Sequence, residues 1–247
     1  MTTRKKCPAG NKECPPWTTE RYLDMREELL TKGSEKNRAF FIKLVPGSEH
    51  VIGLYTQQAK DVVKEILAGD FLSYIEVAKP LYHEEIGLLG AVMAESKQPK
   101  EQMIEYIKRY LPYNTTWATN DSFAASMKCI SKDLAFYFPF IEKLAKSKEP
   151  YNVRMGIILL MNYYLCDEYI DRVLAISDNA KLDHYYVKMG NAWLIATALA
   201  KQYEKTKKFL RTTKLDNWTV NKGIQKACES RRISDEQKAH LRTLKRK

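Results

Sequence analysis

The sequence predicts an all-α protein built as an α-solenoid of HEAT-like antiparallel helix pairs. Apolar residues recur at helical spacing along nearly the whole chain, short turns separate these stretches, and no stretch alternates convincingly as a strand does. Helix pairs recur at very roughly 35–40 residues without literal identity, a spacing typical of stacked repeats. Because solenoids curve, we expect a concave face, and we expect that face to be basic.

The predicted helices begin at capping residues and end at turns. Ser34 precedes one helix, Asp70 precedes another, and Ser234-Asp235-Glu236-Gln237 forms a capping box before the last. The spacing of apolar residues predicts helices over residues 20–30, 34–44, 57–68, 70–78, 80–95, 99–111, 120–127, 131–146, 152–165, 167–176, 183–202, a shorter one that ends near 211, 218–230 and 234–245.

Residues 18–247 are expected to form one domain, because Gly and Pro are scarce and no Ser/Gly-rich linker interrupts them. Residues 1–17 show no periodicity and contain three prolines, so we expect a disordered tail there. No apolar run approaches the roughly 18 residues of a membrane span, and no apolar stretch follows the basic N-terminus as in a secretory signal. We therefore expect a cytoplasmic protein without a membrane partner, and we expect a monomer.

The cysteines and histidines predict neither disulfides nor a metal site. The five cysteines are an odd number and widely scattered, which favours reduced thiols. The four histidines are isolated, and no second Cys/His pair lies at the spacing of a zinc site. We expect no metal and no cofactor.

The stretch Trp117-Ala118-Thr119-Asn120-Asp121 places a large aromatic four residues before a carboxylate. On a helix, Trp117 and Asp121 lie on one face, and an indole beside a carboxylate suits a positively charged ligand between them. A second interpretation is purely structural. Asn120 then caps a helix with Asp121 in its first turn, and Trp117 packs as a hydrophobic staple. These residues alone leave both interpretations open.

The net charge of +11 is concentrated at the C-terminus. From Lys201 to Lys247, fifteen Lys or Arg residues stand against five Asp or Glu residues, and the remainder of the chain is close to neutral. Such a block predicts a polyanionic partner, most often nucleic acid, although a solvated surface has the same composition. The candidates for contacts with a DNA backbone are Lys188, Lys222, Lys226, Arg231 and Arg232.

Two further residues stand out against their surroundings. Arg154 lies near the start of a strongly apolar helix, and Trp193 lies in the middle of another. Equivalent positions of successive repeats line the same face of a solenoid, so both are candidates for one concave site with Trp117 and Asp121. Taken singly, Trp193 also fits a core residue, and Arg154 also fits a surface or ion-paired residue.

Four segments carry a family resemblance: NTTWATND, VRMGIILLMNYYL, YYVKMGNAWLIATALAKQY and TVNKGIQKACESRRISDEQKAHLRTLKR. In this order and with this spacing, the chain from about Glu20 to Lys245 resembles the AlkD-type DNA alkylation repair proteins, which are DNA glycosylases built of HEAT-like repeats. The family's cleft holds a Trp, an Asp four residues on, a later Arg and a second Trp. By resemblance, these roles fall on Trp117, Asp121, Arg154 and Trp193.

The resemblance implies a DNA glycosylase that hydrolyses the N-glycosidic bond of cationic N3- and N7-alkylpurines in duplex DNA without flipping the base. Asp121 would stabilise the oxocarbenium character of the deoxyribose and orient the attacking water. The indoles of Trp117 and Trp193 would attract the cationic base, and Arg154 would hold the phosphate beside the lesion. Water is the only second substrate, so no cofactor is implied.

One turn departs from the family's pattern. Where the family commonly has a turn like Gly-Val-Arg-Thr-Pro, this chain reads Gly53-Leu54-Tyr55-Thr56-Gln57, without the Arg and the Pro. The departure bears on catalysis more than on DNA binding. The alternative function is therefore a non-catalytic HEAT-like protein that binds damaged or distorted DNA. A protein–protein scaffold is a third possibility, against which the basic C-terminal block counts.

Overall fold

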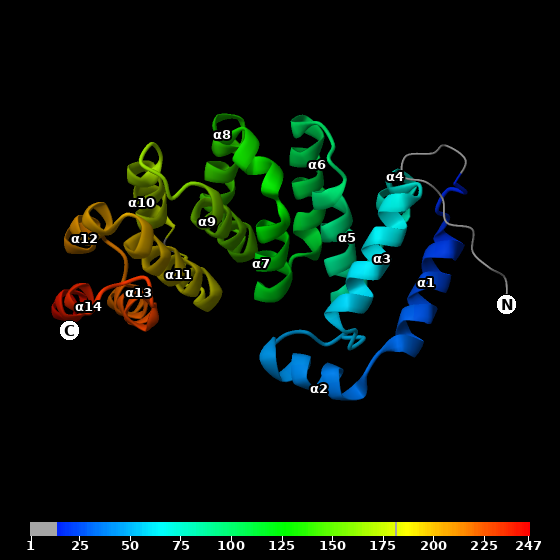
Figure 1. The fold of residues 1–247 in the computed structure, drawn as a ribbon, viewed down its shortest axis with the longest axis horizontal. Coiled ribbons are helices and arrows are strands. Elements are labelled where there is room, and N and C mark those ends of the chain that lie inside the picture. The colour runs from blue at the N-terminus through cyan, green and yellow to red at the C-terminus, as the bar shows by residue number, and fades with distance from the viewer. Residues whose placement is uncertain (1–13, 181) are drawn as a thin grey trace. The chain divides into compact units, whose positions relative to one another are not determined.

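The computed structural model describes residues 14–180 and 182–247 (Figure 1). Within these residues, fourteen α-helices and two short 3-10 helices follow one another, with no strand between them. This finding confirms the all-α class. Each amphipathic stretch forms a helix because that conformation buries its apolar stripe against neighbouring helices.

The helices agree with the predicted ranges to within a few residues. Those before residue 130 are α1 (Thr19–Lys32), α2 (Glu35–Leu44), α3 (Thr56–Ala68), α4 (Phe71–Val77), α5 (His83–Glu95), α6 (Lys100–Tyr110) and α7 (Trp117–Ser126), and the 3-10 helices cover Leu111–Tyr113 and Lys128–Lys132. Those after it are α8 (Leu134–Ala145), α9 (Pro150–Tyr163), α10 (Ile170–Asn179), α11 (Tyr185–Lys201), α12 (Tyr203–Thr212), α13 (Asn217–Glu229) and α14 (Asp235–Thr243). Predicted caps are present: Ser34, Asp70 and Ser234 each accept a backbone N–H of the following turn.

Two compact units divide the chain between Cys129 and Ile130. In the first unit, α3, α5 and α7 pack in sequence, with α4 and α6 against α5 and with α1 against α4. In the second unit, α9, α11 and α13 form a row, while α8, α10 and α12 form another. Helices that are adjacent in sequence thus pack as pairs, as in an α-solenoid. The single domain of residues 18–247 stays a prediction.

The pair of α8 and α9 runs antiparallel. The hydroxyl of Tyr164, just after α9, donates to the backbone carbonyl of Leu134 at the start of α8 over 2.9 Å. The ring of Tyr164 also meets that of Phe138 with 5.2 Å between centroids. The C-terminal end of one helix therefore lies beside the N-terminal end of the other, as the HEAT-like pairing predicts.

The predicted tail of residues 1–17 falls mostly outside the described residues. Within the described part, Trp17 is buried and its backbone N–H donates to Ser73 Oγ over 2.7 Å. The guanidinium of Arg21 lies 4.1 Å from the centroid of the Trp17 ring. Cys14 is disulfide-bonded, so the expectation of reduced thiols is wrong for this residue. A count of cysteines does not reveal which of them approach one another in space, and that proximity decides whether a disulfide forms.

Candidate nucleic-acid interface

Helix α7 begins at Trp117, because Thr116 is its N-cap. The hydroxyl oxygen of Thr116 accepts the backbone N–H of Thr119 over 3.3 Å. Asn120 lies inside the helix and is fully buried, so the interpretation in which it caps the helix is wrong. Thr116 instead accepts a backbone N–H of the first turn, and the helix begins at Trp117. Trp117 and Asp121 therefore lie one turn apart on the same helix.

One side of α7 is held against its neighbours. The ring of Phe123 stacks on that of Tyr110 with 4.0 Å between centroids, and the Tyr110 hydroxyl donates to the Thr119 carbonyl over 3.1 Å. Trp117 and Asp121 are not among the buried residues of the helix, and both are partly exposed. The structure therefore confirms that an indole and a carboxylate share one accessible helix face.

Arg154 is buried within the second unit, with 3% of its surface exposed. Its Nη1 donates to the backbone carbonyl of Tyr186 over 2.5 Å, which connects α9 to the first turn of α11. The interpretation of Arg154 as a surface residue is wrong, because the guanidinium is enclosed by helix packing. Burial and the neighbouring Tyr186 raise the pKa of Tyr151, and the charge of Arg154 opposes this shift.

Trp193 is 42% exposed, so the interpretation of this residue as core is wrong. It lines an open hollow of about 270 Å³, together with Lys226, Glu229 and Arg232. We call this feature the Trp193 hollow. Two of the predicted DNA-backbone residues, Lys226 and Arg232, therefore lie around the same hollow as a predicted lesion-binding tryptophan. An accessible indole beside two cations suits a polyanion that carries aromatic bases.

The other predicted backbone residues occupy different places. Lys222 lies one turn before Lys226 on α13, and Arg231 is exposed in the turn that follows α13. Lys188 pairs with Asp183 at 2.6 Å, and this hydrogen bond raises the pKa of the Lys188 ammonium. The structure does not bring Lys188 to the Trp193 hollow, and the charge of Lys188 is offset by a carboxylate.

The four predicted cleft residues divide between the two units. Trp117 and Asp121 belong to the first unit, whereas Arg154 and Trp193 belong to the second. Their convergence in one cleft stays a prediction, as does the concave basic face.

The sequence reasoning missed two exposed aromatic residues. Tyr185 and Trp218 open α11 and α13, are 57% and 42% exposed, and bring their ring centroids to 5.8 Å. The available signal was weak, because an aromatic residue at the start of an amphipathic helix fits the core equally well. Only the packing of α11 on α13 shows that both rings face solvent.

The turn that departs from the family pattern is held by a carboxylate. Glu84 accepts the backbone N–H groups of Ile52, Gly53 and Leu54 at 2.8, 2.6 and 3.2 Å. Gly53 has φ +90°, and a Cβ atom there would lie 2.4 Å from the Ser34 carbonyl oxygen, so glycine is required. These three N–H groups donate to the Glu84 carboxylate, so they are not available to bind a phosphate.

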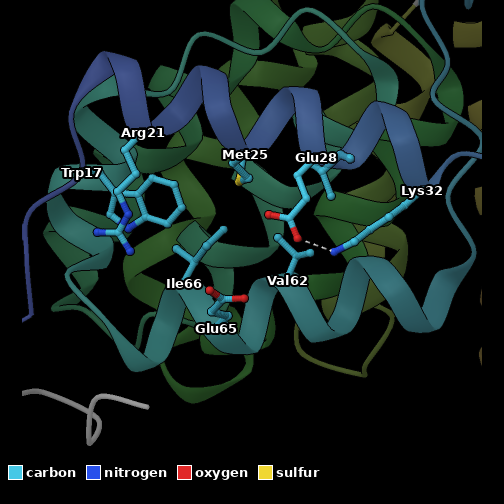
Figure 2. A pocket seen from close by; sticks show the side chains of 9 residues that line it. Trp17, Arg21, Met25, Glu28, Lys32, Val62, Glu65 and Ile66 are labelled. Atoms are coloured by element: carbon cyan, nitrogen blue, oxygen red, sulfur yellow. Dashed lines mark hydrogen bonds and ion pairs between the residues drawn. The ribbon is translucent and has the colours of Figure 1, made fainter. Parts of the chain in front are cut away.

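A separate groove lies between α1 and α3 (Figure 2). Met25, Val62 and Ile66 form its apolar part, and Glu28 and Lys32 form an ion pair of 2.7 Å along its edge. None of the predicted site residues lines it. Among residues 14–180 and 182–247, no group of three or more His, Cys, Asp or Glu residues is arranged to hold a metal ion. No helix in the described part of the chain has the length and apolarity required to span a membrane.

The paired helices define the class of protein as an α-solenoid. A family model described as "DNA alkylation repair enzyme" matches residues 25–227, and the chain therefore belongs to that family. Membership implies DNA as the substrate. A comparison with curated proteins finds no match.

Proposed function

We propose that the protein is a DNA glycosylase that hydrolyses the N-glycosidic bond of cationic N3- and N7-alkylpurines in duplex DNA, without extruding the base into a pocket. The observation that carries the proposal is the placement of Trp117 and Asp121 one turn apart on the accessible side of α7. Family membership supports it, because DNA alkylation repair requires recognition of alkylated DNA.

Alkylated purines of this kind carry a positive charge, and the chemistry follows from that charge. The bond between C1′ and the base nitrogen breaks, and its electron pair goes to the base, which leaves as a neutral molecule. The deoxyribose is left with oxocarbenium character, which the negative charge of Asp121 stabilises. Water adds its oxygen to C1′ and releases a proton. No redox partner or metal takes part in this balance.

The aromatic residues supply recognition in this proposal. The indole of Trp117 attracts the cationic base through its ring face, and the exposed indole of Trp193 offers a further aromatic contact to DNA. Lys226 and Arg232 at the Trp193 hollow bind the adjacent phosphates with little sequence preference. Arg154 is buried and donates a hydrogen bond to the Tyr186 carbonyl, so in this proposal it also holds the start of α11 in place.

A non-catalytic DNA-binding protein is the second candidate function. The observation that favours it is the turn around Gly53, where Glu84 occupies three backbone N–H groups and no Lys or Arg is present between Gly53 and Gln57. Residues 53–57 therefore offer DNA no cationic side chain, and three N–H groups at the start of the turn are already bonded to Glu84. This protein would bind damaged or distorted DNA without excising the base.

Release of methylated bases from alkylated duplex DNA distinguishes the two candidates. We expect wild type to release N7-methylguanine or N3-methyladenine, and Asp121→Asn to abolish release while DNA binding at low salt is retained. Asp61→Asn is the matched control, since Asp61 is an exposed carboxylate on α3 and should leave release unchanged. No metal is added in any reaction.

The outcomes separate the candidates clearly. Release by wild type and by Asp61→Asn, but not by Asp121→Asn, supports the glycosylase and the role of Asp121. Absence of release from every variant, with salt-sensitive DNA binding retained, refutes the glycosylase and supports the binding protein. Absence of both release and binding refutes both candidates.

A further inference from the structure

The N-terminal ends of α11 and α13 carry an exposed aromatic pair that the proposed chemistry does not use. Tyr185 is 57% exposed and Trp218 is 42% exposed, and their ring planes meet at 54°. The ring of Tyr186 lies 5.1 Å from that of Tyr185 and extends the aromatic surface toward α9. Large aromatic side chains gathered on one exposed surface mark an interaction site.

The packing of α11 on α13 explains why these rings face solvent. Val220, Gly223 and Ile224 are among the buried residues of α13, and a Cβ atom at Gly223 would lie 2.9 Å from Ile195 of α11. This close contact occupies the inner sides of both helices. Tyr185 and Trp218 lie away from it, at the ends where the two helices begin.

The aromatic pair and the Trp193 hollow are both formed by α11 and α13. On each helix the residue of the aromatic pair comes before the residue of the hollow. The rings of Tyr185 and Trp218 lie close together at one end, and eight residues further along each helix Trp193 and Lys226 line the same hollow. The two helices therefore run parallel. At a rise of about 1.5 Å per residue, eight residues correspond to about 12 Å.

We propose that Tyr185 and Trp218 form a second nucleic-acid contact, which stacks on an unpaired base three to four nucleotides away from the base at Trp193. The spacing follows from about 12 Å along the helices and about 3.4 Å per nucleotide along a strand. This inference rests on the proposed DNA-binding function, and it specifies the substrate as a duplex with a short unpaired stretch beside the lesion.

An unpaired base fits this surface better than a protein partner does. Aromatic rings stack on any unpaired base, whereas paired bases in a duplex hide their faces. Lys222 and Lys226 follow Trp218 at successive turns of α13 and attract a phosphate backbone. Each aromatic residue has a carboxylate two residues before it. Asp216 accepts the N–H and the hydroxyl of Thr219 at 3.0 and 2.7 Å, and Asp183 pairs with Lys188 at 2.6 Å.

The test compares two unmodified DNA molecules of equal length and at equal salt, one an intact duplex and one with a gap of about four nucleotides. We expect wild type to bind the gapped duplex about tenfold more tightly, as measured by fluorescence anisotropy. Trp218→Ala should remove this preference and leave binding to the intact duplex within about twofold, and Trp218→Phe should keep most of it. Leu72→Ala, at an exposed apolar residue of α4, is the control that should change neither affinity.

Two results overturn the proposal. One is equal binding of the two DNA molecules by wild type, and the other is a preference that survives in Trp218→Ala. If circular dichroism shows that Trp218→Ala does not fold, the proposal is tested instead by the quenching of tryptophan fluorescence on addition of DNA, in wild type and in Trp218→Phe. Because Trp117 and Trp193 also contact DNA in the proposed function, the measured quantity is the additional quenching by gapped DNA over intact duplex. Additional quenching that disappears in Trp218→Phe supports the proposal, and additional quenching that persists contradicts it.

The proposed glycosylase activity and the preference for gapped DNA are measured in separate experiments. Release of methylated bases is measured on alkylated intact duplex, and the gap preference is measured on unmodified DNA. A protein that releases bases but binds both unmodified DNA molecules equally retains its proposed function and lacks the second contact. A protein that prefers the gapped duplex but releases no base has the second contact and lacks the activity.

Discussion

The guanidinium of Arg154 donates a hydrogen bond from Nη1 to the backbone carbonyl of Tyr186, 2.5 Å away. This bond joins α9 to the first turn of α11, the helix that carries Tyr185 and Trp193. A cationic group that is 3% exposed stays in place only when such bonds replace its hydration. Arg154 therefore positions the aromatic residues of α11 from within the packed unit.

Replacement of Arg154 should lower stability. Arg154→Met removes the donor and leaves the Tyr186 carbonyl without this partner, so we expect the free energy of unfolding to fall by about 1.5–3 kcal/mol in urea titrations. Arg172→Met on α10 is the control, because Arg172 is exposed and its pair with Glu142 spans 3.8 Å. A loss of less than about 1 kcal/mol is expected there. Equal losses in both variants would contradict the positioning role.

Lysines of α13 should set the salt dependence of DNA binding. Each phosphate contact contributes about 0.9 to the slope of log affinity against log salt concentration. Lys222→Ala and Lys226→Ala should each lower the magnitude of this slope by about that amount, without changing sequence preference. Lys146→Ala on α8, whose ammonium pairs with Glu142 at 2.9 Å, should leave the slope unchanged. An unchanged slope in both α13 variants would place the DNA elsewhere.

The carboxylate of Glu84 should be essential for the turn around Gly53. Glu84→Ala removes the acceptor of three backbone N–H groups, so we expect about 2–3 kcal/mol of lost stability and faster amide hydrogen exchange at Ile52 and Leu54. Glu105→Ala on α6 removes an exposed carboxylate with an i,i+3 lysine partner and should cost less than about 0.5 kcal/mol. Unchanged exchange rates at the turn in Glu84→Ala would show that this carboxylate does not hold it.

A methyl group at Gly223 should separate α11 from α13. Gly223→Ala places a Cβ atom 2.9 Å from Ile195 Cγ2, and overpacking of this kind costs about 1–3 kcal/mol. Gly87→Ala on α5 is the matched control, since nothing lies within 4 Å of the added atom. There the better helix propensity of alanine should raise stability by about 0.5–1 kcal/mol. If both variants gain stability, the contact between α11 and α13 is looser than the structure shows.

The helices were predictable because their signals are local. Ser34, Asp70 and Ser234 cap the helices that they were expected to cap, and the ranges differ by a few residues at most. The error at Asn120 has the same local origin. Thr116 and Asn120 both have capping side chains, and the choice between them depends on the burial of Asn120 against neighbouring helices.

Pattern reasoning reached part of the candidate site and missed the rest. It selected Trp193, Lys226 and Arg232, which the structure brings to one hollow, and it also selected Lys188, which pairs with Asp183 instead. It did not find Trp218. A lysine or a tryptophan has the same spacing in sequence whether it faces solvent or a neighbouring helix, so spacing cannot distinguish these positions.

The sequence by itself determined that the chain is all-α, where its helices begin and end to within a few residues, and that Trp117 and Asp121 share a helix face. These properties depend on contacts within about one helical turn. The family also follows from the sequence, through the match over residues 25–227. Only the tertiary structure decided that Arg154 is buried, that Trp193 is exposed, and that Tyr185 meets Trp218. Those properties depend on contacts between helices that are distant in sequence, and the free energy of packing the whole unit selects them.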